Sequence, residues 1–242
     1  MALPELILPI YELTIPSSGQ EIKVRPFIVK EEKLLLMAAA ANDDQEVINT
    51  TIQVIKNCIV EGDVVVEKLP FFDIDYLFIA LRAKSIGESV DMSFICNNVV
   101  ENNRKCSHKF ETAIDIAKVT INKDESISNE IKLSSTVSMK LKYPPYSVMR
   151  ALKDDDDIIE QKIKVLMACV DYVVDKDKVL TTKDFSKEEL RAFIESMTEE
   201  QFEKVDPFIT NFPTFSVNVE KECESCGFLH QIEYKDFNSF FY

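Results

Sequence analysis

The sequence predicts an α+β protein in which two helical blocks alternate with antiparallel hairpins, two of which form a zinc-ribbon-like site. Apolar residues recur at helical spacing in two blocks, whereas they alternate with polar residues near the start, in the middle and near the end of the chain. Cysteines accompany the middle and the last alternating regions. We therefore expect a single interdependent unit over residues 1–242, with successive segments 1–88, 89–145, 146–213 and 214–242.

The composition excludes several classes of function. The 242 residues include 28 Lys and Arg against 42 Asp and Glu, which gives a net charge of −14. This acidic excess argues against binding to nucleic acid or to an anionic membrane surface, because both depend on Lys and Arg. The chain has 4 glycines and no GxGxxG or GxxxxGK pattern, so we do not expect a Rossmann or P-loop enzyme with a phosphate-binding loop. We also expect no small-molecule substrate.

The sequence also lacks the features of an exported or membrane-spanning chain. Its start has no basic region before an apolar run, and no stretch reaches the roughly 18 apolar residues of a spanning helix. We expect a soluble cytoplasmic protein. In that reducing compartment the cysteines are expected to be buried thiols or metal ligands rather than disulfides.

Segment 1–88 is predicted to hold a hairpin followed by helices. Apolar residues alternate over 11–15 and 22–24, on either side of the turn-forming Pro16-Ser17-Ser18-Gly19. Three stretches with helical signals follow, namely Leu34–Ala41, the isoleucines at 48, 52, 55 and 59, and Pro70–Gly87.

The middle segment changes to the period of strands. Alternation over 90–96 and over 110–116 predicts two strands joined by a polar loop. Another alternating run over 137–143 is predicted to be a strand that stops at Pro144-Pro145, because a central strand does not tolerate proline. The polar residues 122–129 are expected to form a loop or a hairpin connection.

Segment 146–213 is predicted to be helical. An apolar stripe at helical spacing comprises Ile159, Ile163, Leu166, Val170 and Val173. The acidic run Asp154–Asp157 is expected to cap the helix that carries this stripe. Ser186-x-x-Glu189 and Thr198-x-x-Gln201 are capping boxes and predict two further short helices. Alternation over 215–219 and 232–234 then predicts a hairpin with cysteines in its turn.

Cys223-Glu-Ser-Cys226-Gly227 is the sharpest local signal. Two thiols three positions apart on a tight turn, followed by glycine and flanked by strands, are typical of a zinc-ribbon knuckle. One knuckle supplies half of the ligands that tetrahedral Zn²⁺ needs. The middle strand pair can supply the rest, although its cysteines are separated by nine residues, where about two to four are usual. We therefore predict a structural Zn²⁺ held by Cys96, Cys106, Cys223 and Cys226.

Other interpretations of these residues stay open. His108 or His230 could replace one cysteine, or the thiols could be free of metal. A thioredoxin-like role is disfavoured, because that redox motif normally opens a helix. A zinc-ribbon regulator that binds nucleic acid would need a basic face. The basic residues near Cys106 are too few to provide one in a chain of net charge −14, namely Arg104, Lys105 and Lys109. A thiol or zinc enzyme is the remaining alternative, but no catalytic set can be assembled, so we do not predict an enzyme.

The other cysteines and the last aromatic residues are interpreted more simply. Cys58 and Cys169 fall on or beside apolar helical stripes, so we expect them to pack in the core. The sequence ends with aromatic side chains that either return to the core or dock onto a partner, namely Phe237, Phe240, Phe241 and Tyr242.

A resemblance to a known family is carried by residues 3–36, which include LPELILPIYELTIPSSG and VRPFIVKEEKLLL, and by residues 72–78 and 81–88. Together with the cysteine-bearing strand pair that follows, they resemble the baseplate hub proteins of T-even-like, contractile-tailed bacteriophages. The resemblance covers the first 150 residues in sequence and the rest in layout. The long loop between Cys96 and Cys106 departs from the compact knuckle expected.

The resemblance implies a hub subunit or a hub assembly protein of the tail baseplate. It implies other baseplate and tail hub proteins as partners, and a location in the host cytoplasm during assembly or in the baseplate of the virion. It implies no catalytic residues. The function expected is therefore protein–protein association, with zinc fixing the geometry of the binding surface.

Overall fold

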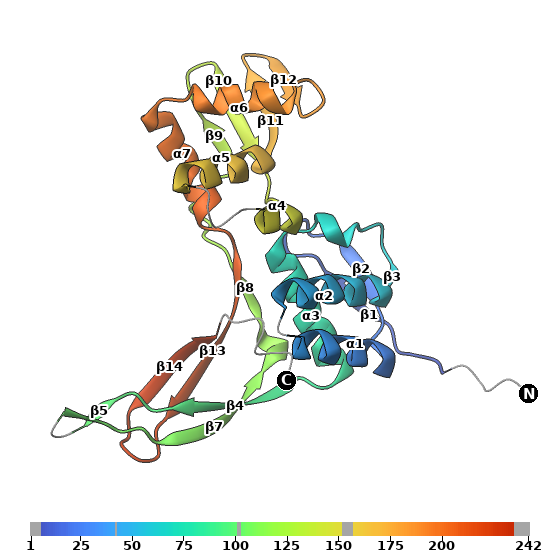
Figure 1. Ribbon diagram of the computed structural model, residues 1–242, viewed down its shortest axis with the longest axis vertical. Coiled ribbons are helices and arrows are strands. Elements are labelled where there is room, and N and C mark those ends of the chain that lie inside the picture. The colour runs from blue at the N-terminus through green and yellow to red at the C-terminus, as the bar shows by residue number, and fades with distance from the viewer. Residues whose placement is uncertain (1–5, 42, 101–102, 152–156, 235–242) are drawn as a thin grey trace, which may run out of the picture. The chain divides into compact units, whose positions relative to one another are not determined.

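The structure is a computed structural model, and it describes residues 6–41, 43–100, 103–151 and 157–234 (Figure 1). Helices combine with antiparallel sheets, which confirms the α+β class. Contacts between residues divide the chain into two compact units, which consist of residues 1–66, 72–122 and 214–242, and of residues 67–71 and 123–213. The interdependence of the whole chain in folding stays a prediction.

The first unit begins with the predicted hairpin. Its strands β1 (Tyr11–Thr14) and β2 (Glu21–Val24) pair antiparallel, and β3 (Ile59–Glu61) adds to β2. The N–H of Gly19 donates to the carbonyl of Ile15 over 2.8 Å and closes the turn. Gly19 has a φ of +70°, a conformation that glycine adopts without strain.

Three α-helices follow in this unit, and their bounds are α1 (Val29–Ala40), α2 (Asp44–Cys58) and α3 (Phe71–Ser85). A short 3-10 turn, Val66–Lys68, precedes α3. Ile59 was predicted to continue the helical stripe of α2, but it is the first residue of β3 instead. The helix ends at Cys58 because Ile59 adopts an extended backbone that pairs with β2.

A buried carboxylate ties α3 to the β1–β2 turn. Asp73 is fully buried and accepts hydrogen bonds from the backbone N–H of Ser17, over 2.9 Å, and from the Ser17 hydroxyl. Burial raises the pKa of Asp73 to about 6, and the hydrogen bonds from Ser17 oppose that rise. The carboxylate thus accepts both the backbone and the side-chain hydrogen of Ser17 in the turn.

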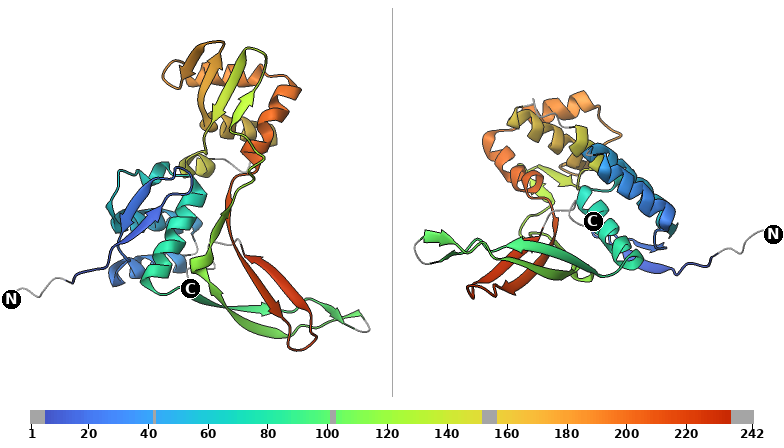
Figure 2. Two further views of the ribbon diagram at one scale, coloured as in Figure 1. Left: turned by 180° about the vertical axis from the view of Figure 1, so that it is seen from behind. Right: turned by 60° about the horizontal axis from the view of Figure 1, so that its bottom comes forward.

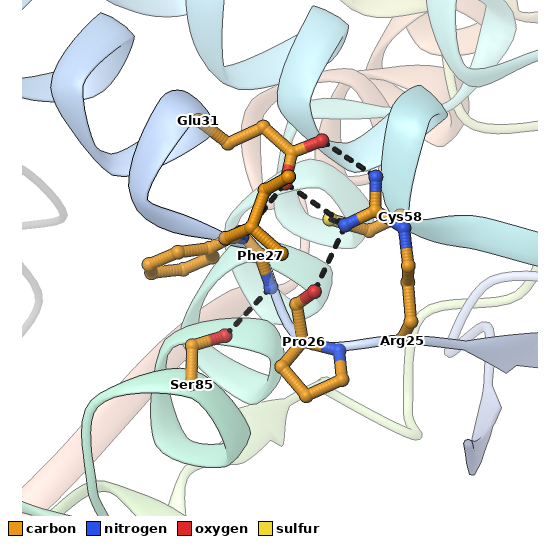
Figure 3. Close-up of polar contacts among 7 residues, drawn as sticks. Arg25, Pro26, Phe27, Glu31, Cys58 and Ser85 are labelled. Atoms are coloured by element: carbon orange, nitrogen blue, oxygen red, sulfur yellow. Dashed lines mark hydrogen bonds and ion pairs between the residues drawn. The ribbon is translucent and has the colours of Figure 1, made fainter. Parts of the chain in front are cut away.

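A buried ion pair fixes the connection between β2 and α1 (Figure 3). Arg25 donates to the Glu31 carboxylate over 2.6 and 2.9 Å, and the N–H of Ile28 donates to it over 2.9 Å. Because of the Arg25 guanidinium, the pKa of Glu31 is lowered. The N–H of Phe27 donates to the Ser85 hydroxyl over 3.0 Å, which anchors the same connection to the end of α3.

Two β ribbons complete the first unit, as the alternating sequences predict (Figures 1 and 2). Their strands are β4 (Ser89–Ile95), β5 (Val99–Val100), β6 (Arg104–Lys105), β7 (Lys109–Asp115), β8 (Thr120–Asn122), β13 (Thr214–Glu222) and β14 (Leu229–Tyr234). β4 pairs with β7 and β5 with β6, whereas β13 pairs with both β14 and β8. A 3-10 turn, Ile116–Lys118, precedes β8. Phe94 stacks on Phe110 at 5.8 Å within the β4–β7 ribbon, and it meets Tyr234 of the β13–β14 ribbon edge-on at 6.3 Å.

The second unit is a four-stranded antiparallel sheet packed with helices. Its strands, in the order β12-β11-β10-β9, are β9 (Glu130–Lys132), β10 (Val137–Leu141), β11 (Val170–Asp175) and β12 (Lys178–Thr181). Its helices are α4 (Tyr146–Ala151), α5 (Ile158–Cys169), α6 (Lys187–Glu195) and α7 (Glu199–Thr210). Residues from the sheet, including Met139, share one apolar core with residues from α5, α6 and α7, including Leu166, Leu190 and Val205.

The prediction that segment 146–213 is wholly helical was wrong, because it also contains β11 and β12. The stripe of apolar residues continues past α5, so Val170 and Val173 lie in β11 rather than on the helix. Val173 pairs with Met139 of β10, and its β-branched neighbour Val174 also suits a strand. β10 is an interior strand, and it ends before Pro144-Pro145, as its sequence requires.

The predicted helix caps of the second unit are confirmed. Ser186 and Glu189 exchange hydrogen bonds of 3.1 and 2.7 Å, and Thr198 and Gln201 exchange bonds of 3.3 and 2.9 Å. Asp157 caps α5 by accepting from the N–H of Glu160, whereas Asp154–Asp156 lie outside the described residues. Over the part of the chain that the structure describes, no helix has the length and apolar character to cross a bilayer.

Candidate metal centre

The four cysteines predicted as ligands lie together at one end of the two ribbons. Their sulfur atoms all lie within 4.8 Å of one another, although 117 residues separate Cys106 from Cys223. Cys96 follows β4, Cys106 precedes β7, and Cys223 and Cys226 occupy the turn between β13 and β14. Each ribbon therefore contributes two thiols.

The β5–β6 pair explains how cysteines nine residues apart form a knuckle. The N–H of Cys106 donates to the carbonyl of Asn98 over 2.8 Å. This bond brings Cys106 close to Cys96 after the β5–β6 hairpin. The N–H of Ser107 then donates to the carbonyl of Cys96 over 2.9 Å, and the N–H of Cys96 donates to the carbonyl of His108 over 2.8 Å. The intervening loop thus leaves the local geometry of a short knuckle intact.

The second knuckle repeats the same hydrogen bonds. The N–H of Gly227 donates to the carbonyl of Cys223 over 2.8 Å, and the N–H of Cys223 donates to the carbonyl of Phe228 over 2.9 Å. In both knuckles the residue after the second cysteine is left-handed, with a φ of 69° at Gly227 and 56° at Ser107. The left-handed conformation of Ser107 was not predicted from the sequence, because it is usually glycine that adopts this conformation.

The spacing of the sulfurs fits one tetrahedral ion. Cys96 Sγ lies 3.7 Å from Cys226 Sγ, and Cys106 Sγ lies 3.9 Å from Cys223 Sγ. Four Zn–S bonds of about 2.3 Å arranged in a tetrahedron place their sulfurs about 3.8 Å apart. Both distances far exceed the roughly 2.05 Å of a disulfide bond. The residues present therefore suit a metal ion that is bound by one pair of thiolates from each ribbon.

The surroundings of the thiols differ in burial and in hydrogen bonding. Cys96 and Cys223 are each 1% exposed, whereas Cys106 and Cys226 are partly exposed. Burial raises the pKa of the Cys96 thiol to about 12. The backbone N–H of Phe228, followed by the side-chain amide of Asn98 at 3.6 Å, lowers the pKa of Cys226 to about 7. A divalent cation among them would favour the thiolate form of all four.

The two histidines take different places at this site. His108 contributes its backbone carbonyl to the first knuckle. His230, on β14, is 8% exposed, and its Nε2 lies 3.2 Å from Cys96 Sγ. Its ring packs between Phe228, at 4.9 Å, and Phe110, at 5.4 Å.

Cys58 and Cys169 are separate from this cluster. Both are fully buried, on α2 and α5 respectively, as expected for core thiols. Burial raises the pKa of each to about 12, so both are uncharged near neutral pH. The aromatic residues from Phe237 to Tyr242 lie outside the described residues.

Fold and site together define an α+β protein whose two ribbons meet in a zinc-ribbon-like cluster of four cysteines. A family model described as "T4 bacteriophage base plate protein" matches residues 8–242, so the chain belongs to that family. The match confirms the resemblance to T4-like phage baseplate proteins and extends it beyond residue 150. No curated protein and no solved structure matches the chain.

Membership of this family makes the chain a structural protein of the phage baseplate. It places the protein in the phage tail, in association with other tail proteins, and it favours a structural role over an enzymatic one. The chemistry of the candidate site is compatible with that role, because four thiolates bound to one ion would leave no open position for a substrate.

Proposed function

We propose that this protein is a subunit or an assembly factor of the baseplate hub, that it acts by protein–protein association, and that its four-cysteine site holds a structural zinc ion. The observation that carries the proposal is the convergence of four sulfurs from two distant knuckles at the spacing of a tetrahedral site. The metal would hold the two ribbons in one fixed arrangement for partners to recognise.

Zinc is the metal that suits this donor set best. Thiolates are soft ligands, and a tetrahedral set of four is typical of structural zinc sites. The reducing host cytoplasm, in which we place assembly, keeps such cysteines available as ligands. Cys96, Cys106, Cys223 and Cys226 would occupy all four positions, so the ion would stabilise the fold and take no part in turnover.

The role in the hub, as opposed to another part of the baseplate, rests on the sequence resemblance carried by residues 3–36, 72–78 and 81–88. Its partners would be other hub proteins. The net charge of −14 supports association with proteins rather than with nucleic acid or an anionic membrane.

The metal is tested by elemental analysis of protein purified under reducing conditions. We expect one zinc per chain in the wild type and in Cys58→Ala, which alters a buried cysteine outside the cluster. Cys106→Ser should contain less than one fifth of that amount. A wild type without metal, or a Cys106→Ser variant with a full equivalent, would refute the zinc site.

The association is tested by co-expression with the hub proteins of the same phage, followed by native mass spectrometry of the purified complexes. We expect a defined complex with at least one hub protein, and loss of that complex in Cys106→Ser but not in Cys58→Ala. Complexes formed solely with baseplate proteins outside the hub would overturn the hub assignment and leave the baseplate family unaffected.

A further inference from the structure

His230 places its Nε2 within hydrogen-bonding distance of a sulfur of the cluster, 3.2 Å from Cys96 Sγ. We propose that His230 is a positioning residue of the metal site, which donates its Nε2–H to the Cys96 thiolate and is not itself a ligand. The inference rests on the proposed zinc site. It argues against the alternative in which a histidine replaces one of the cysteines.

The contact with Cys96 has the geometry of a hydrogen bond to sulfur. Nε2 of His230 lies 3.2 Å from Cys96 Sγ, and both side chains are buried, with 8% and 1% exposed. A polar ring nitrogen in such a place needs a partner, because an unpaired buried donor is costly. The thiolate of a metal-bound cysteine is an acceptor for that N–H.

The matching knuckles show why a histidine is not needed for packing. Counted from the second cysteine of each knuckle, Phe110 and His230 occupy the same position, four residues after Cys106 and Cys226 respectively. The two rings contact each other at 5.4 Å across the ribbons. In the first ribbon a phenylalanine ring fills this position, so packing alone does not need a ring nitrogen. The nitrogen of His230 adds a polar contact with Cys96.

The four sulfurs would occupy all four coordination positions of a tetrahedral ion, so His230 would not be a ligand. The sulfur–sulfur distances of 3.7 Å between Cys96 and Cys226 and 3.9 Å between Cys106 and Cys223 suit a set of four thiolates, and all four sulfurs lie within 4.8 Å of one another. The first ribbon supplies its own donors as well, since the backbone N–H of Asn98 favours the Cys96 thiolate and the Asn98 side chain approaches Cys226. His230 brings a further donor from the opposite ribbon, so the hydrogen bond to Cys96 also links the two ribbons outside the metal.

The test compares His230→Phe, His230→Gln and the matched control His108→Phe. Zinc affinity is measured by competition with a chromophoric chelator, and the donor set by the absorption spectrum after Co²⁺ substitution. We expect His230→Phe to bind zinc about 10–100-fold more weakly, as for the loss of other groups that orient ligands. His230→Gln, which keeps an N–H, should bind within about threefold of the wild type. The Co²⁺ spectrum should indicate four thiolates in every variant.

Several outcomes would overturn the inference. Wild-type affinity in His230→Phe would show that the hydrogen bond does not matter, and a loss confined to His230→Gln would show a role in packing alone. A wild-type Co²⁺ spectrum of three thiolates and one nitrogen would make His230 a ligand. A wild type that binds no metal at all would instead refute the proposed zinc site itself.

A measurement on the unmodified chain keeps the proposal testable if His230→Phe fails to fold. In protein loaded with ¹¹³Cd, a hydrogen bond to a coordinating sulfur transmits scalar coupling between the metal and the donated proton. We expect a correlation between ¹¹³Cd and Hε2 of His230. A His230 ring whose Nε2 carries no proton would refute the inference.

Discussion

Removal of the proposed zinc ion should separate the two ribbons of the first unit while leaving the chain intact. We expect chelation under reducing conditions to increase amide hydrogen exchange in β4, β7, β13 and β14 by at least about 100-fold. The apolar core that the ribbons share is small. Its buried members are Cys96, Phe110 and Cys223, and two of these are the proposed ligands themselves.

The expected size of the effect follows from the sequence separation of the ligands. Closing the 117-residue separation between Cys106 and Cys223 costs about 4 kcal/mol beyond a constant. A structural zinc ion contributes about 10–16 kcal/mol, which leaves a margin of roughly 6–12 kcal/mol. One fully buried Phe contributes about 1.5–3 kcal/mol, so Phe110 cannot replace the metal.

The assay is hydrogen exchange read by mass spectrometry, with metal content measured on the same samples. Cys58→Ala is the matched control, and it should keep both its metal and the protection of the ribbons. Unchanged exchange in the four strands after complete loss of metal would refute the reasoning. The same data test interdependence, because one interdependent unit should also lose protection in β10 and β11.

Three further predictions concern stability. Ser107→Gly should raise the free energy of unfolding by about 1 kcal/mol in denaturant titrations, because Ser107 has a φ of 56°; a loss of stability would contradict the left-handed knuckle. Burial raises the pKa of Asp75 to about 7, so the wild type should become more stable as the pH falls from 8 to 5, with the gain complete below the unfolded pKa of about 3.9. Asp75→Asn should reduce that slope to the part that the raised pKa of Asp73 contributes, and it should be the more stable form at pH 8; equal thermal melting profiles of the wild type across this range would exclude the assignment. Ser186→Ala should destabilise the second unit by about 1 kcal/mol, and Ser186→Asp should restore it, because both Ser and Asp accept the N–H of Glu189; equal stability of all three would show that this cap is not needed.

Local chemistry made much of this fold predictable from sequence. The capping boxes at Ser186 and Thr198 set the starts of α6 and α7, because side chain and backbone satisfy each other within four residues. Alternation likewise located β4 and β7. The β11–β12 hairpin was missed because apolar spacing alone cannot distinguish the end of a helix from a buried strand, and the pairing partner of Val173 lies in β10.

The site was predictable as a set of residues but not as a geometry. The knuckle at Cys223 is recognisable by its spacing, and the first pair followed from the need for four ligands. The return of Cys106 to Cys96 depends on the β5–β6 pair, whose two-residue strands leave little pattern in a sequence. The approach of His230 to Cys96 depends on packing between the ribbons, and local sequence patterns do not predict such packing.

The pairing of β8 with β13 has a consequence for the order in which the protein is made. Asn122 lies opposite Thr214 in this pair, and the roughly 90 residues between them form the second unit. At a typical translation speed, synthesis of this segment takes about 5–20 s. During that time β8 has no β13 to pair with, and Cys96 and Cys106 lack the two cysteines of the second knuckle. A ribosome that stalls within this insertion would therefore leave a nascent chain with an unpaired strand edge and half a metal site.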